Sequence, residues 1–132
     1  SGGDPLINSN EYLFWLLDEI GRIPHIKRIR IHSRMILSIP DRIDAELVAK
    51  LSTLSKQVII VTHCNHPHEL GPEHARIFSS LKSAGVTLLN QSVLLKQIND
   101  DANVLRDLSL ALFGYSPLLP FYVRPSEWCS TF

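Results

Sequence analysis

Polar residues suited to ligand binding lie in four short groups along this 132-residue chain. Glycine lets a backbone approach a ligand closely, and carboxylate and guanidinium groups form charge-assisted hydrogen bonds. A lone glycine pair is usually only a turn, but four polar groups favour a shared ligand site. In chain order the groups are Gly2-Gly3-Asp4-Pro5, His32-Ser33-Arg34, Thr62-His63-Cys64-Asn65-His66-Pro67 and Asn90-Gln91-Ser92.

A zinc site is a second hypothesis for the third group. Histidine and cysteine are preferred zinc ligands, and His63, Cys64, His66 and His68 lie close together in the sequence. Consecutive residues of a strand or turn point in different directions, however, and the spacing matches no helical or knuckle-type ligand set. The other cysteine, Cys129, is too distant for a paired motif. We therefore expect no metal ligands in this chain.

Composition excludes several classes of protein. Lysine plus arginine and aspartate plus glutamate number 13 each, so the chain lacks the basic excess that gives affinity for nucleic acid. Its apolar runs are shorter than the roughly 20 residues that span a bilayer. The start, Ser1-Gly2-Gly3, carries no secretion signal. We expect a cytoplasmic protein with neither nucleic acid nor membrane as a partner.

Hydrophobic periodicity predicts alternating helices and strands. Ser9 or Asn10 is positioned to cap the first helix, and Asp41 or Asp44 the second. Each polar group follows a predicted strand or opens the chain. The predicted helices span residues 11–20, 43–54, 72–84 and 101–113, and the predicted strands span 27–32, 58–61, 86–89 and 118–123.

The strand centres recur about every thirty residues, the length of one βα unit in a barrel of eight such units. Alternating strands and helices form a parallel sheet. We therefore predict an α/β fold, a partial TIM barrel, forming an open arc of about four or five parallel strands with outer helices. Ligands of such folds bind at the carboxyl ends of the strands. Residues 1–132 are expected to form a single partial barrel, truncated at both ends.

Several segments resemble the lysine 2,3-aminomutase family of radical S-adenosylmethionine (SAM) enzymes, in order and spacing from residue 1 to about 113. The version Arg30-Ile31-His32-Ser33-Arg34 is most similar to the branch that β-lysylates elongation factor P. The segments are Ser-Gly-Gly-Asp-Pro-Leu (1–6), Ile-Pro-His-Ile-Lys-Arg-Ile-Arg-Ile-His-Ser-Arg (23–34), Asn-His-Pro (65–67), Leu-Leu-Asn-Gln-Ser-Val-Leu-Leu (88–95) and Asn99-Asp100.

The resemblance implies an isomerase that converts α-lysine to β-lysine with three cofactors. A four-iron four-sulfur cluster would cleave SAM to a 5′-deoxyadenosyl radical, which would abstract hydrogen from lysine bound to pyridoxal phosphate. The substrate would be free lysine or a lysine on elongation factor P. In such enzymes the cofactors carry out the difficult chemistry, while the protein positions and shields them.

The same resemblance assigns SAM contacts to residues at the strand ends. Gly2, Gly3 and Asp4 are similar to a turn whose backbone and carboxylate accept hydrogen bonds from the methionyl ammonium. Arg34, beside Ser33, would grip the SAM carboxylate, unless it is merely a solvated surface arginine. The ribose and adenine would contact His63, Asn65, Gln91 and Ser92, although Asn65 and Gln91 are also residue types that cap strand ends.

The chain departs from the family pattern in two ways. It lacks the CxxxCxxC loop whose thiolates hold the cluster, so we expect it to bind no iron. That loop and the phosphate-gripping arginines would lie upstream, and the Schiff-base lysine downstream. Near the end, Glu127 could replace the acidic residue that binds the substrate ammonium. Alone, the chain should be inactive.

Two rival hypotheses remain. One is a catalytically inactive remnant, or an interaction module, that keeps the βα arc and binds another protein or a second copy through its open sheet edges. The other is a small flavodoxin-like α/β binding domain, which explains the alternation of elements but not the ordered motifs. A cysteine triplet in the flanking coding sequence would support the enzyme.

Overall fold

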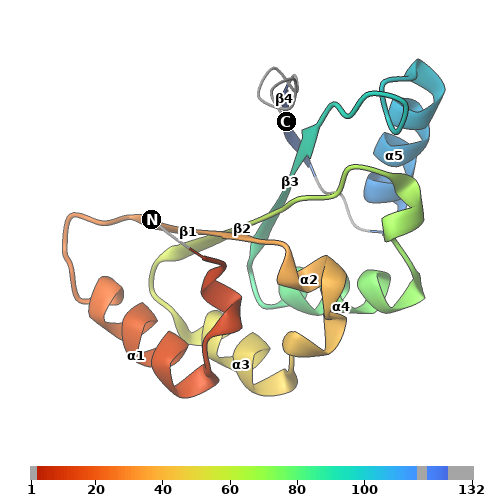
Figure 1. Cartoon of the computed structure of the whole chain (residues 1–132). Coiled ribbons are helices and arrows are strands. Elements are labelled where there is room, and N and C mark those ends of the chain that lie inside the picture. The colour runs from red at the N-terminus through yellow and green to blue at the C-terminus, as the bar shows by residue number, and fades with distance from the viewer. Residues whose placement is uncertain (1–2, 116–118, 125–132) are drawn as a thin grey trace.

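The computed structural model describes residues 3–115 and 119–124, in which strands and helices alternate along the chain (Figure 1). Three short 3-10 turns lie at Pro5–Ile7, Pro40–Arg42 and Pro67–Glu69. The strands are β1 (Arg28–Ser33), β2 (Gln57–Thr62), β3 (Thr87–Val93) and β4 (Leu119–Arg124), and the helices are α1 (Asn10–Gly21), α2 (Met35–Ser38), α3 (Ala45–Thr53), α4 (Pro72–Ser83) and α5 (Ala102–Tyr115).

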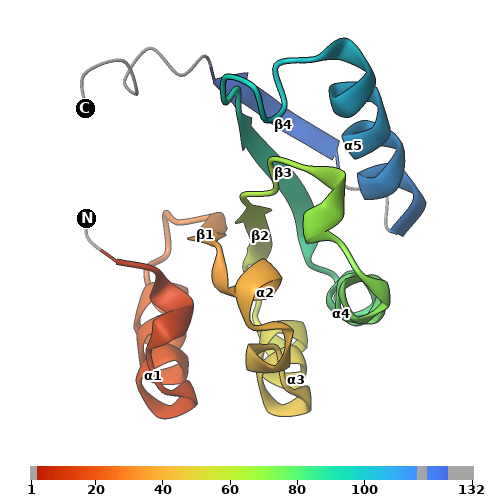
Figure 2. The same cartoon turned by 45° about the vertical axis from the view of Figure 1, so that its right-hand side comes forward.

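The strands form one parallel sheet in the order β1-β2-β3-β4. Successive strands are therefore neighbours, as expected when each connection carries a helix across one face of the sheet. Figure 2 shows the sheet as an arc, with the helices on one side of it. The predicted α/β fold with a parallel sheet and outer helices is confirmed.

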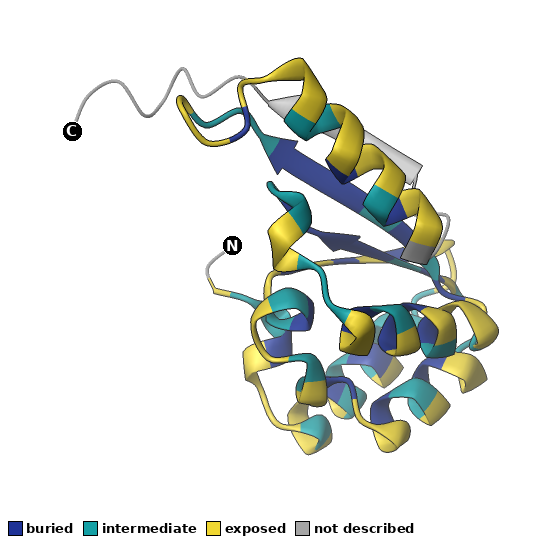
Figure 3. Cartoon of the chain, turned by 90° about the vertical axis from the view of Figure 1, so that its right-hand side faces the viewer, coloured by how far each residue is buried: buried dark blue, intermediate teal, exposed yellow. Residues whose placement is uncertain are grey.

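The two faces of the sheet differ in chemistry. β1 alternates strictly, so that Ile29 and Ile31 are buried while Arg28, Arg30 and His32 are exposed. The apolar set joins side chains of β2, β3 and all the longer helices in a single core, between the sheet and the helices (Figure 3). The opposite face of β1 carries arginine and histidine side chains, and the last of them, His32, lies next to the carboxyl end of the strand.

Local capping explains where the helices begin. Ser9 caps α1 by accepting a hydrogen bond from Tyr12 N, and Asp44 caps α3 by accepting one from Leu47 N. These contacts decide between the paired candidates that the sequence offered. Gly85, at φ +82°, ends the turn after α4 in a conformation that favours glycine.

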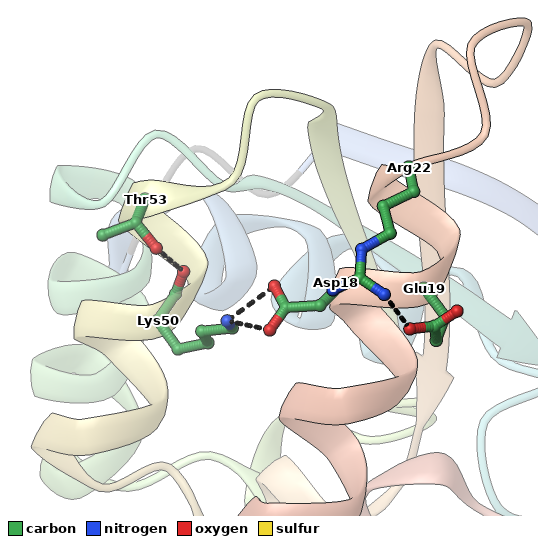
Figure 4. Close-up of polar contacts among 5 residues, drawn as sticks. All are labelled: Asp18, Glu19, Arg22, Lys50 and Thr53. Carbon is green, nitrogen blue, oxygen red and sulfur yellow. Dashed lines mark hydrogen bonds and ion pairs between the residues drawn. The ribbon is translucent and has the colours of Figure 1, made fainter.

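Polar contacts on the outer surface join α1 to α3 (Figure 4). Lys50 Nζ lies 2.7 Å from both carboxylate oxygens of Asp18. Asn10 Nδ2 donates to Asp44 Oδ2 at 3.0 Å and to Glu46 Oε2 at 2.7 Å. These partly exposed pairs fix the two helices side by side, at the end of the arc that carries β1.

The structure corrects two details of the sequence prediction. A short helix, α2, directly follows β1, whereas the sequence showed no helical period there because four residues are too few for one. The third strand was predicted to end before Asn90, but β3 continues to Val93. Asn90, Gln91 and Ser92 are therefore strand residues. Among the described residues, no helix is long and apolar enough to cross a membrane.

Candidate functional site at the strand ends

The carboxyl ends of β1, β2 and β3 lie at one edge of the sheet. Parallel pairing aligns Ser33 with Thr62, and Thr62 with Asn90. Three of the four groups predicted from the sequence therefore lie at the same level of neighbouring strands. Two separate networks of hydrogen bonds, one after β1 and one between the ends of β2 and β3, hold this edge together.

Asp4 ties the start of the chain to the end of β1. Its Oδ2 atom accepts hydrogen bonds from Ser33 Oγ at 2.9 Å, Arg34 N at 2.7 Å and Met35 N at 3.3 Å. Gly3, directly before it, has φ +81°, which lies in the left-handed region that glycine tolerates. We call this set of contacts the β1 junction. It brings the predicted residues Gly3, Asp4, Ser33 and Arg34 together.

Two histidines lie beside this junction. The rings of His32 and His63 have centroids 5.8 Å apart and planes inclined at 53°. Burial and the adjacent Arg30 guanidinium lower the pKa of His32, and burial, Arg34 and His32 lower the pKa of His63, against an opposing effect of Asp4. Both rings are therefore mainly neutral at pH 7, and each offers one donor and one acceptor.

Asn90 and Ser92 hold the backbone that follows β2. Asn90 Oδ1 accepts from Cys64 N at 2.9 Å, and Asn90 Nδ2 donates to Cys64 O at 3.0 Å. Ser92 Oγ donates to the same carbonyl at 2.8 Å and accepts from Asn90 Nδ2 at 2.9 Å. The predicted ligand residue Ser92 thus has its hydroxyl committed to the chain itself.

Asn99 and Asn65 extend this network to the loop after β3. The side chain of Asn99 is fully buried, and its Nδ2 donates to Asn65 O at 2.7 Å and to Val93 O at 2.9 Å. Its Oδ1 accepts from Leu95 N at 2.6 Å. Asn65 Oδ1 in turn accepts from Val93 N at 2.8 Å. We call the contacts of Asn65, Asn90, Ser92 and Asn99 the amide clasp.

Gln91 points away from the amide clasp. Asn90 and Ser92 contact each other, so the residue between them in the strand is directed to the opposite face. The pairing of β3 with β4 is irregular here, because Asn90 pairs with Pro120 and Gln91 with Tyr122. The extra residue therefore lies on β4, and the side chains along β3 still alternate between the two faces. Gln91 shares its face with His32 and His63.

Glu69 stabilises the turn that carries His63 and Asn65. Its Oε1 atom accepts from Asn65 N at 2.7 Å and from His66 N at 2.8 Å. Burial raises the pKa of the adjacent Cys64 thiol to about 12, and the Glu69 carboxylate adds to that shift. A thiol in this state is protonated and poorly nucleophilic, so Cys64 serves through its backbone.

From the sequence, no role in the site was assigned to three residues of this edge: Asn90 and Asn99, which lie in motifs singled out above, and Glu69. Strand alternation carried a signal for the first, because Asn90 and Ser92 have the same parity as buried Leu88 while Gln91 does not. The partners of Asn99 lie up to 34 positions away, which no local pattern reveals.

Two predicted site residues, Gly2 and Glu127, lie outside the described residues. Within residues 3–115 and 119–124, no group of three or more histidine, cysteine or acidic side chains is placed to hold a metal ion. Cys64 Sγ, one of the zinc ligands considered above, instead contacts His66 O at 3.3 Å.

A hollow on the described part of the chain lies away from this edge. It is an open groove of about 860 Å³ between α3 and α4 on the helical side of the sheet. Small side chains such as Ala45, Ala49 and Ser80 line it. The strand ends remain the better candidate site, because charged, imidazole and amide groups converge there on elements that a parallel sheet fixes.

The fold is that of the parallel α/β proteins, a class whose ligands commonly bind at the carboxyl ends of the strands. The chain matches no family model. It is 46% identical over 124 residues to the L-lysine 2,3-aminomutase of Escherichia coli (strain K12), a match that covers 94% of this chain and 36% of the relative. The L-lysine 2,3-aminomutase of Clostridium subterminale is 43% identical over 125 residues. The glutamate 2,3-aminomutase of Clostridioides difficile is 37% identical over 127.

Over nearly its whole length the chain is homologous to one segment of enzymes named L-lysine 2,3-aminomutase. It spans about a third of the length of the curated relatives it matches. The resemblance of its motifs to this family is thereby confirmed over 124 residues.

Proposed function

We propose that this chain forms the SAM-binding part of a radical SAM, pyridoxal phosphate-dependent L-lysine 2,3-aminomutase. The observation that carries the proposal is the 46% identity over 94% of the chain to enzymes of that name. The arc of parallel strands would be part of a TIM barrel of the radical SAM type. An inactive remnant is not favoured, because the similarity extends over nearly the whole chain.

The groups at the strand ends suit the polar parts of SAM. Arg34 is exposed beside His63 and could pair with the methionyl carboxylate through two N–H groups. The backbone at Gly3 is free of a Cβ atom and allows close approach. Neutral His63 and the amide of Gln91 offer donors and acceptors for the ribose and adenine. Gly2 would extend this surface.

The other proposed ligands act differently. The side chains of Ser33, Asn65 and Ser92 bond within the chain, so their contribution to SAM binding is to hold the backbone around it. When bound, SAM would supply the radical that begins the isomerisation. The task of these residues is to keep the ligand fixed and to shield it from water.

The cluster does not fit residues of this chain, and the resemblance assigns the groups that hold pyridoxal phosphate to other parts of the enzyme. A cubane needs three cysteine thiolates here in addition to SAM, whereas the sequence has two cysteines and the Cys64 thiol is buried and protonated. In the proposal both groups are held by parts of the enzyme outside the matched segment. Glu127 is proposed to bind the substrate ammonium.

A segment exchange tests the proposed function. The matched 124 residues of the Escherichia coli enzyme would be replaced by those of this chain, and conversion of α-lysine to β-lysine would be measured anaerobically by chromatography. The parent enzyme carrying the same junctions is the control. We expect the chimera to form β-lysine. A chimera that folds and loads its cluster but forms none, while the control is active, contradicts the proposal.

The substrate is a further part of the proposal. Relatives named for lysine are up to 46% identical, and the relative named for glutamate is 37% identical, which favours lysine. We propose that modification of elongation factor P is the process served. Incubating the chimera with free lysine, free glutamate or lysylated elongation factor P, followed by hydrolysis and separation of α- and β-amino acids, distinguishes the three.

A further inference from the structure

The carboxylate of Asp4 is surrounded by donors from its own chain. Oδ2 accepts from Ser33 Oγ, Arg34 N and Met35 N, and Oδ1 accepts from Leu6 N at 3.0 Å. An ionised carboxylate has about four lone-pair sites, two on each oxygen, so three donors crowd Oδ2 and one lone pair of Oδ1 remains. The sequence suggested that this group binds the methionyl ammonium of SAM. The geometry gives it little capacity for another donor.

These four contacts fix the path of the backbone at the end of β1. Ser33 is the last residue of that strand, and Met35 is the first residue of α2. Arg34 lies at the bend between them, with its N–H on Asp4 at 2.7 Å and its side chain exposed. The position of the Arg34 guanidinium next to His63 therefore depends on Asp4.

We propose that Asp4 is a positioning residue, which places Arg34 for an anionic ligand group and does not itself bind the ligand. This inference rests on the proposed function, because it takes SAM as the ligand. It adds that the Asp4 carboxylate of the Gly-Gly-Asp turn accepts hydrogen bonds from its own chain instead of from the ligand. The ammonium of the ligand is then left to backbone carbonyls of the turn.

Amide hydrogen exchange tests the positioning without any ligand. In the full 132-residue chain, Asp4→Asn removes the negative charge and replaces one carboxylate oxygen by an NH₂ group, which must face either Leu6 N or the three donors of Oδ2. The Arg34 and Met35 amides should exchange roughly tenfold to a hundredfold faster, as expected for loss of hydrogen bonds to a charged acceptor. If Asp4→Asn does not fold, Asp4→Ser keeps one acceptor, as Ser9 does for α1. Unchanged exchange at both amides overturns the proposal.

Asp44→Asn is the matched control. Asp44 is also a capping aspartate, whose pKa is lowered by its hydrogen bond from Leu47 N, but it caps α3 on the helical side of the sheet. This variant should speed exchange at Leu47 and leave Arg34 and Met35 unchanged. Equal effects of both variants at Arg34 would mean general loosening of the fold, which contradicts a specific role of Asp4.

A double-mutant cycle then asks whether Asp4 acts through Arg34. SAM affinity would be measured by titration in the cluster-loaded chimera with Asp4→Asn, Arg34→Ala and both. We expect each single change to weaken binding about tenfold and the double change to be no worse than Arg34→Ala alone. Independent, multiplicative losses would overturn the proposal and make Asp4 a direct ligand. A chimera that binds no SAM refutes the proposed function, and the exchange experiment still decides whether Asp4 positions Arg34.

Discussion

The β1 junction and the amide clasp both fix the backbone that follows a strand, but they use different hydrogen-bonding groups. Each holds the chain just beyond a strand end, so that a neighbouring side chain faces the proposed ligand. The β1 junction uses one carboxylate, Asp4, at a partly exposed position. The amide clasp uses neutral groups, and its members Asn90, Ser92 and Asn99 are all buried.

This difference determines which substitutions should destabilise the β1 junction and which the amide clasp. Hydrogen bonds to an ionised group are individually stronger, at about 1.5–3 kcal/mol against about 0.5–1.5 kcal/mol for neutral ones. A buried neutral network gains less per bond but leaves orphaned groups when a member is removed. The stability of the β1 junction should therefore depend on individual hydrogen bonds to Asp4. The stability of the amide clasp should depend on every buried polar group keeping a hydrogen-bond partner.

The largest expected effect concerns how well the amide clasp excludes solvent. The pKa of the buried Cys64 thiol is raised to about 12, so at pH 8 its thiolate fraction falls roughly a thousandfold below that of a free cysteine with a pKa of about 8.5. In a Cys129→Ser chain, a disulfide reagent should react with Cys64 more slowly by about this factor, and at the ordinary rate in concentrated urea. Fast labelling of the folded chain would show that the amide clasp is open.

The next effect is on stability, through Asn99. Asn99→Ala leaves the Asn65 and Val93 carbonyls and the Leu95 N–H without their partner inside the protein. We expect a loss of about 3 kcal/mol in the free energy of unfolding, measured by urea denaturation. Ser109→Ala removes an exposed side-chain contact with a helix carbonyl and should cost less than about 0.5 kcal/mol. Similar values for the two variants would remove the distinction between buried and exposed contacts.

Two serines allow a direct comparison of the junctions. Ser33 and Ser92 are both buried, and each hydroxyl donates one hydrogen bond and accepts another. Ser33 donates to a carboxylate and Ser92 to a carbonyl. Ser33→Ala should therefore cost about 2 kcal/mol and Ser92→Ala about 1 kcal/mol, by the same denaturation measurement. The reverse order would contradict the comparison.

The smallest expected effect is a pH dependence at the β1 junction. The pKa of His63 and that of His32 are lowered in the folded chain. Below the ordinary value of about 6.5 the unfolded chain therefore takes up protons first, so stability falls as the pH decreases from that value toward the lowered pKa. His63→Gln should flatten the dependence of unfolding free energy on pH. An unchanged slope would mean that His63 is not desolvated.

Much of the fold was predictable because it follows local rules. Helical periodicity, the caps at Ser9 and Asp44, and the continuous apolar run of β2 were enough to predict a parallel α/β arrangement. The short helix α2 was missed because four residues are too few for a helical period and because its first N–H bonds to Asp4, 31 positions away. Such a contact is created by the fold and leaves no local pattern.

The candidate site was predictable only as a set of positions. The sequence singled out Asn90, Gln91 and Ser92 as one polar group. It did not show that Asn90 and Ser92 lie on one face of β3 and Gln91 on the other. Alternation from buried Leu88 would have separated Gln91 from its neighbours. The donors that occupy Asp4 come from residues about thirty positions away, so its in-chain role required the structure.

One titration tests the central claim that SAM binds at the strand ends, on the face of the sheet that carries His32, His63 and Gln91. SAM would be titrated calorimetrically into the cluster-loaded chimera, its Gln91→Ala variant and its Gln57→Ala variant, in which the changed glutamine lies at the opposite end of β2. The account predicts a dissociation constant at least about tenfold higher for Gln91→Ala and an unchanged one for Gln57→Ala. An unchanged constant for Gln91→Ala would contradict the claim.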